Sequence, residues 1–579
     1  MIRVLRRGSG TPATGPLERG GRRPLRAILA LVVVSLTTLP LAACATVPDS
    51  GPVREGLESL DQGERGVLFN PSGPIPGADQ ETIVRGFVRA ASSSEGDYEI
   101  ARQFLAPTYA DQWDPWSGVI VDEGAPQFQS PKEGVAVLSL RVVATVDGAG
   151  SMTPAEPGSH DDVQFELAEV GGEWRIVSAP NGIILDRNTF MAVWAARPVY
   201  LLSADRRLVP DTRWFLNRPT MSTQIVRELI AGPSASMAGA LHTAFPKGTV
   251  LMSGSVPIVD GTAVIDLSPE LFDADEVTMD LLKRQVAASL QSVPDVSRFQ
   301  LAVHGTVVDG GPVAASEDLT SGIQNATVMK EGVFGVVSGG EVKEIEGLGE
   351  RVAELGPVAA TVAPDRSAVA VLHDEGVSWV GENETVGIDE RRGLLTPSLD
   401  VLGYVWTYSS SAPGEISATM PGGHVAQLAA PWLEGRRVVA VRVSMGGNRV
   451  AALVARGGES EVLVAGIIRD EDGVPVGLTE TAPVQLWDPG APIDLDWIGD
   501  TRFATLTETG LLGGSGKVMI GEVGRFPVES GAVAGGSSIS GGGSRALLRV
   551  LDDQHRMFAP QGAGWQQQLT DVELLAKVG

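Results

Sequence analysis

The sequence is poor in the residues that build disulfides and metal sites, with one cysteine, Cys44, and six histidines in 579 residues. A single thiol forms no internal disulfide, and no two histidines have the spacing of a zinc-binding helix. The hydrolase motif GxSxG, a phosphate-binding loop and a complete GxGxxG fingerprint are also absent. The sequence therefore predicts no catalytic residue, no metal site and no cofactor, so the protein is expected not to be an enzyme.

Aromatic residues are scarce, at 5% of the chain, whereas glycine and proline are abundant, with 71 and 37 residues. Acidic blocks and long polar tracts, which are typical of disordered chains, are missing. This composition favours globular domains rich in strands and turns. The chain also exceeds the length at which one hydrophobic core stops growing, about 250–300 residues, which predicts several domains.

Long apolar runs are absent except for one near the start. Residues 1–26 carry seven arginines and one acid, Glu18, and residues 27–43 carry no charge. This is the pattern of a secretory signal peptide, predicted over residues 1–43, and the apolar run is too short to favour a stable membrane span. Arg22 and Arg23 raise the alternative of a twin-arginine signal, but the residues after them favour the general export route.

The cysteine stands directly after this apolar run. The sequence Leu41-Ala42-Ala43-Cys44 resembles the bacterial lipobox. The resemblance implies that the thiol of Cys44 carries diacylglycerol, that Cys44 becomes the first residue, and that its amino group is acylated with palmitate. Each buried CH₂ contributes about 0.8 kcal/mol, so such chains anchor a protein stably. The alternative is an ordinary signal peptide with an incidental cysteine.

Basic residues are also in the minority beyond the signal. Residues 44–579 hold 38 basic and 70 acidic side chains, a net charge of −32. Such a chain repels phosphate backbones and anionic lipid headgroups. The sequence therefore excludes nucleic acid as a partner and assigns the membrane contact to the acyl chains. Residues 44–78, with scattered Gly, Pro and Ser, are predicted to be a flexible tether behind that anchor.

A first α+β domain is predicted over residues 79–190. Apolar residues from Ile83 to Ala91 share one helical face, and a second helix is predicted to end at Pro107. Residues 134–148 alternate as a strand, and a hairpin turns at Gly171-Gly172.

Helices followed by a curved antiparallel sheet resemble the NTF2-like cone, whose pocket sometimes holds a ligand or an active site. Trp113, Trp116 and Trp174 are candidates to line such a pocket, although aromatic residues at these positions more often belong to the core.

A second α+β domain is predicted over residues 196–310. Two strands turn at Ala204-Asp205, and a helix ends at Gly232-Pro233. A strand, a helix and a last strand follow. The phrases ELIAGP, TAFPKGTVL, GTAVIDLS and VSRFQLAVHG, in that order, resemble the GerMN module of sporulation and spore-germination proteins. That module implies no catalytic residues.

Helical signals nearly vanish over residues 325–579, and short apolar runs recur there after polar turns. Five positions mark the repeat at intervals of 33 to 54 residues: Pro364, Pro397, Met445, Gly499 and Gly541. A turn and strand repeated at this spacing are typical of a β-propeller, because one four-stranded sheet cannot bury both faces alone. The sequence predicts five to six blades, with residues 332–347 either completing the sixth or closing the ring. A pair of β-sandwiches is the alternative.

One acidic stretch of this region invites a test for calcium. An EF-hand loop that is aligned on Gly473 has Asp472 and Asp470 as ligands but Ile468 at its first position. A hairpin turn is therefore the preferred interpretation.

The order of lipobox, α+β domain, GerMN-like module and propeller resembles the actinobacterial LpqB lipoprotein family over nearly the whole chain. The resemblance implies a location on the outer face of the cell membrane. It also implies a link to the two-component system of the sensor kinase MtrB and its regulator MtrA. Cys44 is the one functional residue that it transfers.

The function expected from this resemblance is to bind the extracytoplasmic part of an MtrB-type sensor kinase and to modulate envelope and cell-division signalling. Two alternatives stay open at this point. One is a cell-envelope hydrolase that uses the propeller or the first domain. The other is a binding protein that senses an envelope glycan or lipid.

Overall fold

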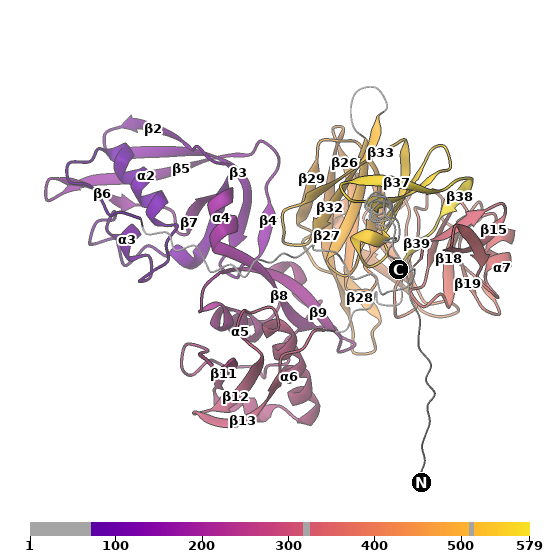
Figure 1. Cartoon of the computed structure of the whole chain (residues 1–579), viewed down its shortest axis with the longest axis horizontal. Coiled ribbons are helices and arrows are strands. Elements are labelled where there is room, and N and C mark those ends of the chain that lie inside the picture. Colours follow the sequence, from indigo (N-terminus) through magenta and orange to yellow (C-terminus); the bar gives the residue numbers. More distant parts are fainter. Residues whose placement is uncertain (1–70, 317–324, 509–513) are drawn as a thin grey trace, which may run out of the picture. The chain divides into compact units, whose positions relative to one another are not determined.

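The computed structural model describes residues 71–316, 325–508 and 514–579, and Figure 1 shows their helices and strands. All of these residues belong to one compact unit, Gly63–Gly579. The predicted signal peptide, Cys44 and nearly all of the predicted tether lie outside the described residues. Within the described ranges, no helix has both the length and the apolar character needed to cross a membrane.

The first domain begins with helix α2 (Gln80–Ala90), as predicted. The side chain of Asp79 accepts a hydrogen bond from the backbone N–H of Thr82 and so caps the helix start. The apolar face of α2 is buried through Ile83, Val84 and Phe87. This face packs on a sheet in the order β6-β5-β3-β1-β7, to which β2 and β4 add at strand β3. The strands are β1 (Gly118–Asp122), β2 (Gln127–Lys132), β3 (Val135–Asp147), β4 (Met152–Pro154), β5 (His160–Val170), β6 (Glu173–Ser178) and β7 (Ile183–Asp186).

Two details of this domain differ from the sequence prediction. The second helix, α3 (Glu99–Arg102), is a single turn, because the chain then joins β6: the N–H of Ala106 donates to the carbonyl of Ile176. Strand β7 lies parallel to β1 rather than antiparallel. The four strands β1, β3, β5 and β6 alternate in direction, so the next strand runs the same way as β1. The likeness to an NTF2-like cone stays a prediction.

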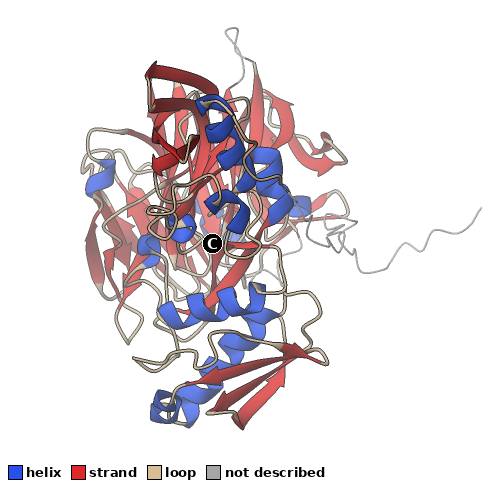
Figure 2. Ribbon diagram, turned by 90° about the vertical axis from the view of Figure 1, so that its left-hand side faces the viewer, coloured by secondary structure: helices blue, strands red, loops and turns tan. Residues whose placement is uncertain are grey.

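The second domain starts with a hairpin of β8 (Trp194–Leu202) and β9 (Leu208–Leu216), which confirms the predicted pair of strands. Helix α4 (Arg187–Val193) leads directly into β8. Figure 2 shows helices on one face of the small sheet β10-β11-β12-β13 in its lower part. The elements are α5 (Met221–Ala231), β10 (Ile258–Val259), β11 (Thr262–Leu267), α6 (Glu276–Leu290), β12 (Arg298–Val303) and β13 (Thr306–Pro312).

The third domain consists of six sheets of four or five strands, which confirms the propeller prediction and its upper number of blades. Helix α7 (Gly349–Glu354) lies between the first and second sheets along the chain. The strands are β14 (Thr327–Lys330), β15 (Val333–Ser338), β16 (Glu341–Glu344), β17 (Ala359–Val362), β18 (Ala368–His373), β19 (Gly376–Gly381), β20 (Thr385–Asp389), β21 (Ser398–Leu399), β22 (Val405–Tyr408), β23 (Glu415–Thr419), β24 (Val425–Ala429), β25 (Arg437–Val443), β26 (Arg449–Arg456), β27 (Glu459–Arg469), β28 (Pro475–Leu478), β29 (Val484–Asp488), β30 (Pro492–Trp497), β31 (Arg502–Glu508), β32 (Ser515–Glu522), β33 (Val528–Ala534), β34 (Gly536–Ser540), β35 (Arg549–Asp552), β36 (Met557–Gln561), β37 (Gly564–Leu569), β38 (Val572–Leu575) and β39 (Lys577–Val578).

The six sheets form a closed ring. One strand of each sheet contacts the corresponding strand of the next, in the cycle β38, β17, β21, β25, β30, β34 and back to β38. Strand β38, the second-to-last strand of the chain, pairs with β14 and so completes the first sheet. Closure removes the free sheet edges that would otherwise invite aggregation, and it excludes the alternative of two β-sandwiches.

Candidate functional site

The one site residue predicted from the sequence, Cys44, lies outside the described residues. Its lipid attachment therefore stays a prediction. Within the described part of the chain, no group of three or more His, Cys, Asp or Glu side chains is placed to hold a metal ion. The acidic stretch near Gly473 forms the predicted hairpin turn between β27 and β28, where the side chain of Asp470 accepts hydrogen bonds from the N–H groups of Asp472 and Val474.

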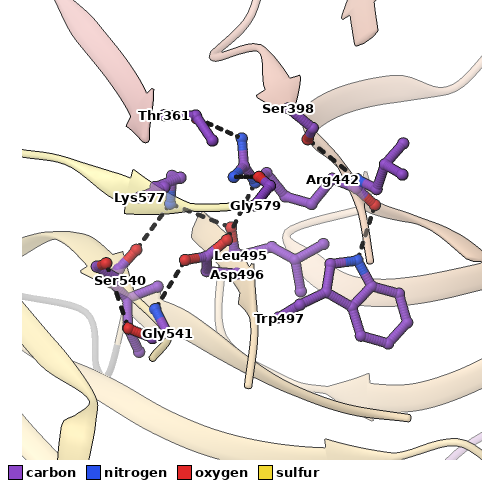
Figure 3. A network of polar contacts seen from close by, with 12 residues as sticks. Thr361, Ser398, Arg442, Leu495, Asp496, Trp497, Ser540, Gly541, Lys577 and Gly579 are labelled. Carbon is purple, nitrogen blue, oxygen red and sulfur yellow. Dashed lines mark hydrogen bonds and ion pairs between the residues drawn. The ribbon is translucent and has the colours of Figure 1, made fainter. Parts of the chain in front are cut away.

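The propeller axis is occupied by a buried polar network, drawn in Figure 3. The guanidinium of Arg442, on the ring strand β25, donates to Oδ1 of Asp496 at 3.1 Å, and both side chains are 1% exposed. Arg442 also donates to the backbone oxygen of Gly579 at 3.1 Å and to Oγ1 of Thr361 at 3.2 Å. The second oxygen of Asp496 accepts the N–H of Gly541 at 2.7 Å. We call these residues, together with Lys577 and Asp494, the axis network.

Lys577 brings a second cation to the axis network from strand β39. Its Nζ donates to Oδ2 of Asp494 at 2.8 Å and to the carbonyl of Ile539 at 2.7 Å. Strand β39 pairs in parallel with the ring strand β17. Each carboxylate of the axis network therefore has a cation beside it, and strand β39 contacts the ring strands β17 and β34. This arrangement argues against the predicted alternative of a hydrolase centred on the propeller axis.

The core of the first domain around Phe87 is filled by side chains. Phe87 meets Trp113 with ring centroids 4.9 Å apart and Phe165 at 6.2 Å. The residual cavity beside Phe87 and Phe165 has a volume of about 20 Å³. Trp113 belongs to this core, and Trp174 packs against it. Of the three tryptophans predicted as candidates to line a pocket, Trp113 is thus a core residue and Trp174 lies at the edge of the core.

Trp116 has a different position, at a hollow of about 430 Å³ between the first domain and the GerMN-like module. We call this hollow the Trp cleft. Its residues come from the start of β1, the loop after β3, the β8–β9 hairpin, helix α5 and the loop before β10. The lining residues are Pro115, Trp116, Gly118, Asp147, Gly148, Ala149, Gly150, Trp194, Trp214, Phe215, Thr220, Thr223, Gln224, Arg227, Glu228, Gly254 and Ser255.

A tight glycine loop forms one wall of the Trp cleft. Oδ1 of Asp147 accepts the N–H groups of Ala149 at 3.0 Å and Ser151 at 2.8 Å. The backbone of Gly150 then pairs with Trp214, whose N–H donates to the Gly150 carbonyl at 2.8 Å. A Cβ at Gly150 would lie 2.5 Å from the Trp214 carbonyl oxygen, and φ is +82°, so glycine is required for this approach.

The acidic side of the Trp cleft is built around the buried Arg213. This guanidinium donates to Asp211 and, at 2.8 Å, to Oε2 of Glu228. Burial raises the pKa of Glu228, Arg213 partly opposes that shift, and the negative charge of Asp147 adds to it. The carboxyl of Glu228 is thus half-buried and lines the Trp cleft. Arg213 is buried and does not line the cleft.

Most residues of the Trp cleft are not predicted by the sequence. Asp147 lies at the end of a strand that is predicted from its alternating residues, which say nothing of a site. Glu228 lies in a helix that is predicted from its apolar residues alone. The glycines at positions 148 and 150 were the available signal, because two glycines beside an aspartate favour a tight turn.

Comparison with known families covers all three described domains. Residues 73–191 match the family described as "Lipoprotein LpqB, N-terminal domain". Residues 198–309 match "Sporulation and spore germination", and residues 332–574 match "Lipoprotein LpqB beta-propeller domain". The matches follow the same order as the three domains of the structure.

Relatives align with most of this chain, and solved structures align with parts of it. The protein "Lipoprotein LpqB" of Thermobifida fusca is 28% identical over 563 residues, which cover 83% of this chain and 87% of that protein. The protein "Lipoprotein LpqB" of Cutibacterium acnes is 26% identical over 515 residues, which cover 82% of this chain and 85% of that protein. The first GerMN domain of GerM from Bacillus subtilis is 19% identical with a TM-score of 0.18, and covers 21% of this chain and 96% of that chain. TolB from Acinetobacter baumannii is 12% identical with a TM-score of 0.32, and the alignment covers 50% of this chain and 85% of that chain.

Two of the three family matches carry one name, and relatives of that name align over most of the chain. The chain belongs to the LpqB lipoprotein family.

Proposed function

We propose that this protein is anchored by lipid on Cys44 to the extracytoplasmic face of the cell membrane, where it binds and modulates a sensor histidine kinase of the MtrB type. The observation that carries the proposal is the lipobox cysteine in a chain whose residues 73–191 and 332–574 match domains of a lipoprotein family. The acyl chains, a palmitoyl group among them, supply the membrane contact that the acidic chain itself disfavours.

Anchoring supports a role in binding because it confines the protein to a thin layer beside the membrane. Confinement raises its effective concentration against the exposed parts of membrane receptors. A weak contact of the GerMN-like module or the propeller with a kinase sensor domain is then sufficient to influence signalling.

The paired charges of the axis network support binding rather than catalysis. The half-buried carboxylate of Asp494 is held by Lys577, and the buried carboxylate of Asp496 is held by Arg442. Neither is available as an acid or a base without breaking an ion pair. Substitution of either partner would leave a charge unpaired and would lower the free energy of unfolding, which is typical of a network with a structural role. The outer surfaces are therefore the parts of the propeller that are free to act.

The proposal is tested by Cys44→Ser in cells. We expect the variant to leave the membrane fraction and to weaken kinase-dependent transcription, while its thermal unfolding matches that of wild-type protein from which residues 1–43 have been removed. Full membrane residence together with full signalling would contradict the anchored model. A serine variant at an exposed position of the propeller turn, Asp472→Ser, serves as the control that keeps both properties.

The identity of the partner is tested by crosslinking in living cells, followed by identification of the captured molecules. Recovery of the sensor kinase with wild-type protein, but not with Cys44→Ser, supports the proposal. Recovery of wall polymer without the kinase would favour the alternative of an envelope-acting or glycan-sensing protein.

A further inference from the structure

The Trp cleft has the size and the lining of a small-molecule site. Ligand pockets usually measure about 300–1,000 Å³ and combine aromatic walls with a few polar groups that fix orientation. The Trp cleft, of about 430 Å³, is lined by Trp116, Trp194 and Trp214. Trp116 is 46% exposed, so an incoming molecule can reach its ring.

The aromatic wall is held in place before any ligand arrives. Nε1 of Trp116 donates to Oδ1 of Asp97 at 2.8 Å, and its ring meets that of Tyr98 edge to face at 5.4 Å. Nε1 of Trp214 donates to the carbonyl of Gly524 at 2.7 Å. Fixed rings lose little freedom on binding, which favours affinity.

The polar groups around these rings are held by hydrogen bonds within the protein. The amide of Gln224 donates to the hydroxyl of Thr220 at 3.3 Å, and the hydroxyl of Thr223 accepts the N–H of Val256 at 2.9 Å. A hydroxyl or an amide can make more than one hydrogen bond, so these groups and the carboxyl of Glu228 can also bind a ligand. The side chain of Arg227 is fixed by its bond to the carbonyl of Gly254 at 2.7 Å. This mixture suits a ligand with many hydroxyl groups, each of which donates and accepts.

The charges of the Trp cleft nearly balance. Asp147 and Glu228 border it as acids and Arg227 borders it as a base, while Arg213 neutralises part of the charge on Glu228. A site without a dominant charge selects neither an anion nor a strong cation. The net charge of −32 on residues 44–579 further disfavours anionic polymers.

We propose that the Trp cleft binds a short neutral saccharide. The apolar C–H face of a sugar ring packs on an indole, and its hydroxyls bind the amide, hydroxyl and carboxyl groups beside it. This inference is independent of the kinase partner, because it concerns the hollow between the first domain and the GerMN-like module alone.

The test measures binding of chitotetraose and cellotetraose to the full lipoprotein in a detergent without a sugar headgroup. Calorimetry and tryptophan fluorescence should both show saturable one-to-one binding of at least one probe. Trp116→Ala should weaken it about tenfold, since an aromatic contact contributes on the order of one factor of ten. Trp116→Phe, which keeps an aromatic face, should retain most of the affinity.

The matched control is Phe272→Ala, because Phe272 is an exposed aromatic residue, at 62%, that lies outside the Trp cleft. It should bind the probe as the wild type does. Absence of saturable binding by both saccharides would overturn the proposal. So would unchanged affinity in Trp116→Ala, provided that its circular dichroism matches the wild type. If choline chloride quenched the tryptophan fluorescence and neither saccharide did, the Trp cleft would be a cation site. That result would also overturn the proposal.

Discussion

At the residue scale, two glycines mark the same point of the propeller repeat but meet different surroundings. A Cβ at Gly541 would lie 1.7 Å from the carbonyl oxygen of Trp497, whereas a Cβ at Gly499 would meet no atom within 4 Å. We expect Gly541→Ala to lower the free energy of unfolding by about 1–3 kcal/mol, as other overpacked sites do. Gly499→Ala should leave it almost unchanged. Denaturant unfolding of the two variants checks this, and equal midpoints would contradict the close packing at Gly541.

Glu228 gives a prediction about pH. Burial raises its pKa in the folded state, so the folded protein holds the proton more tightly than the unfolded chain does. The resulting stabilisation is complete below the unfolded pKa and is lost as the pH rises through the folded pKa.

Glu228→Gln cannot titrate, so its unfolding temperature should fall less than that of the wild type as the pH rises from about 4 to about 8. Scanning calorimetry over this range measures the difference. Glu471→Gln, which removes an exposed carboxylate from a propeller turn, should follow the wild type. Parallel curves for Glu228→Gln and the wild type would show that the raised pKa is wrong.

At the scale of elements, the two last strands of the chain have separate roles. Strand β38 closes the ring by pairing with β14, and β39 delivers Lys577 to Asp494. Removal of residues 572–579 should abolish the cooperative unfolding of the propeller, because the first sheet loses its ring strand. Removal of residues 577–579 alone should cost about 3–5 kcal/mol, since it leaves a largely buried carboxylate unpaired. Limited proteolysis and calorimetry distinguish the two, and identical behaviour of both truncations would contradict this division.

The repeat of the propeller was predictable from the sequence, but its closure was not. Pro364, Met445, Gly499 and Gly541 each lie in the turn between the first and second strands of a sheet, where local turn chemistry leaves a visible signal. The pairing of β38 with β14 joins segments about 240 residues apart, as the bond from Lys330 to Thr570 shows, and no local pattern records such a contact. The short helix α3 was mispredicted for the same reason, because its end is set by a bond to β6.

The candidate sites show the same contrast. Cys44 is recognisable from its neighbours alone, because the lipobox is contiguous. The Trp cleft unites Trp116, Asp147 and Glu228 from three distant segments, so the sequence could offer one of its tryptophans but not their meeting.

At the scale of the whole molecule, the acidic charge predicts how the protein meets a membrane. Cys44→Ser protein should remain in the supernatant when vesicles rich in phosphatidylglycerol are sedimented, because residues 44–579 carry a net charge of −32. Wild-type lipoprotein should sediment with the same vesicles through its acyl chains. Sedimentation of the serine variant would point to a membrane-binding surface on the folded domains instead.

The proposed anchor depends on the chemical state of Cys44, which mass spectrometry of the protein purified from membranes determines. We predict that the amino-terminal peptide begins at Cys44 and carries a diacylglyceryl group on its sulfur and a fatty acyl group on its nitrogen. A peptide that begins elsewhere, or a Cys44 free of lipid, would contradict the proposed anchor.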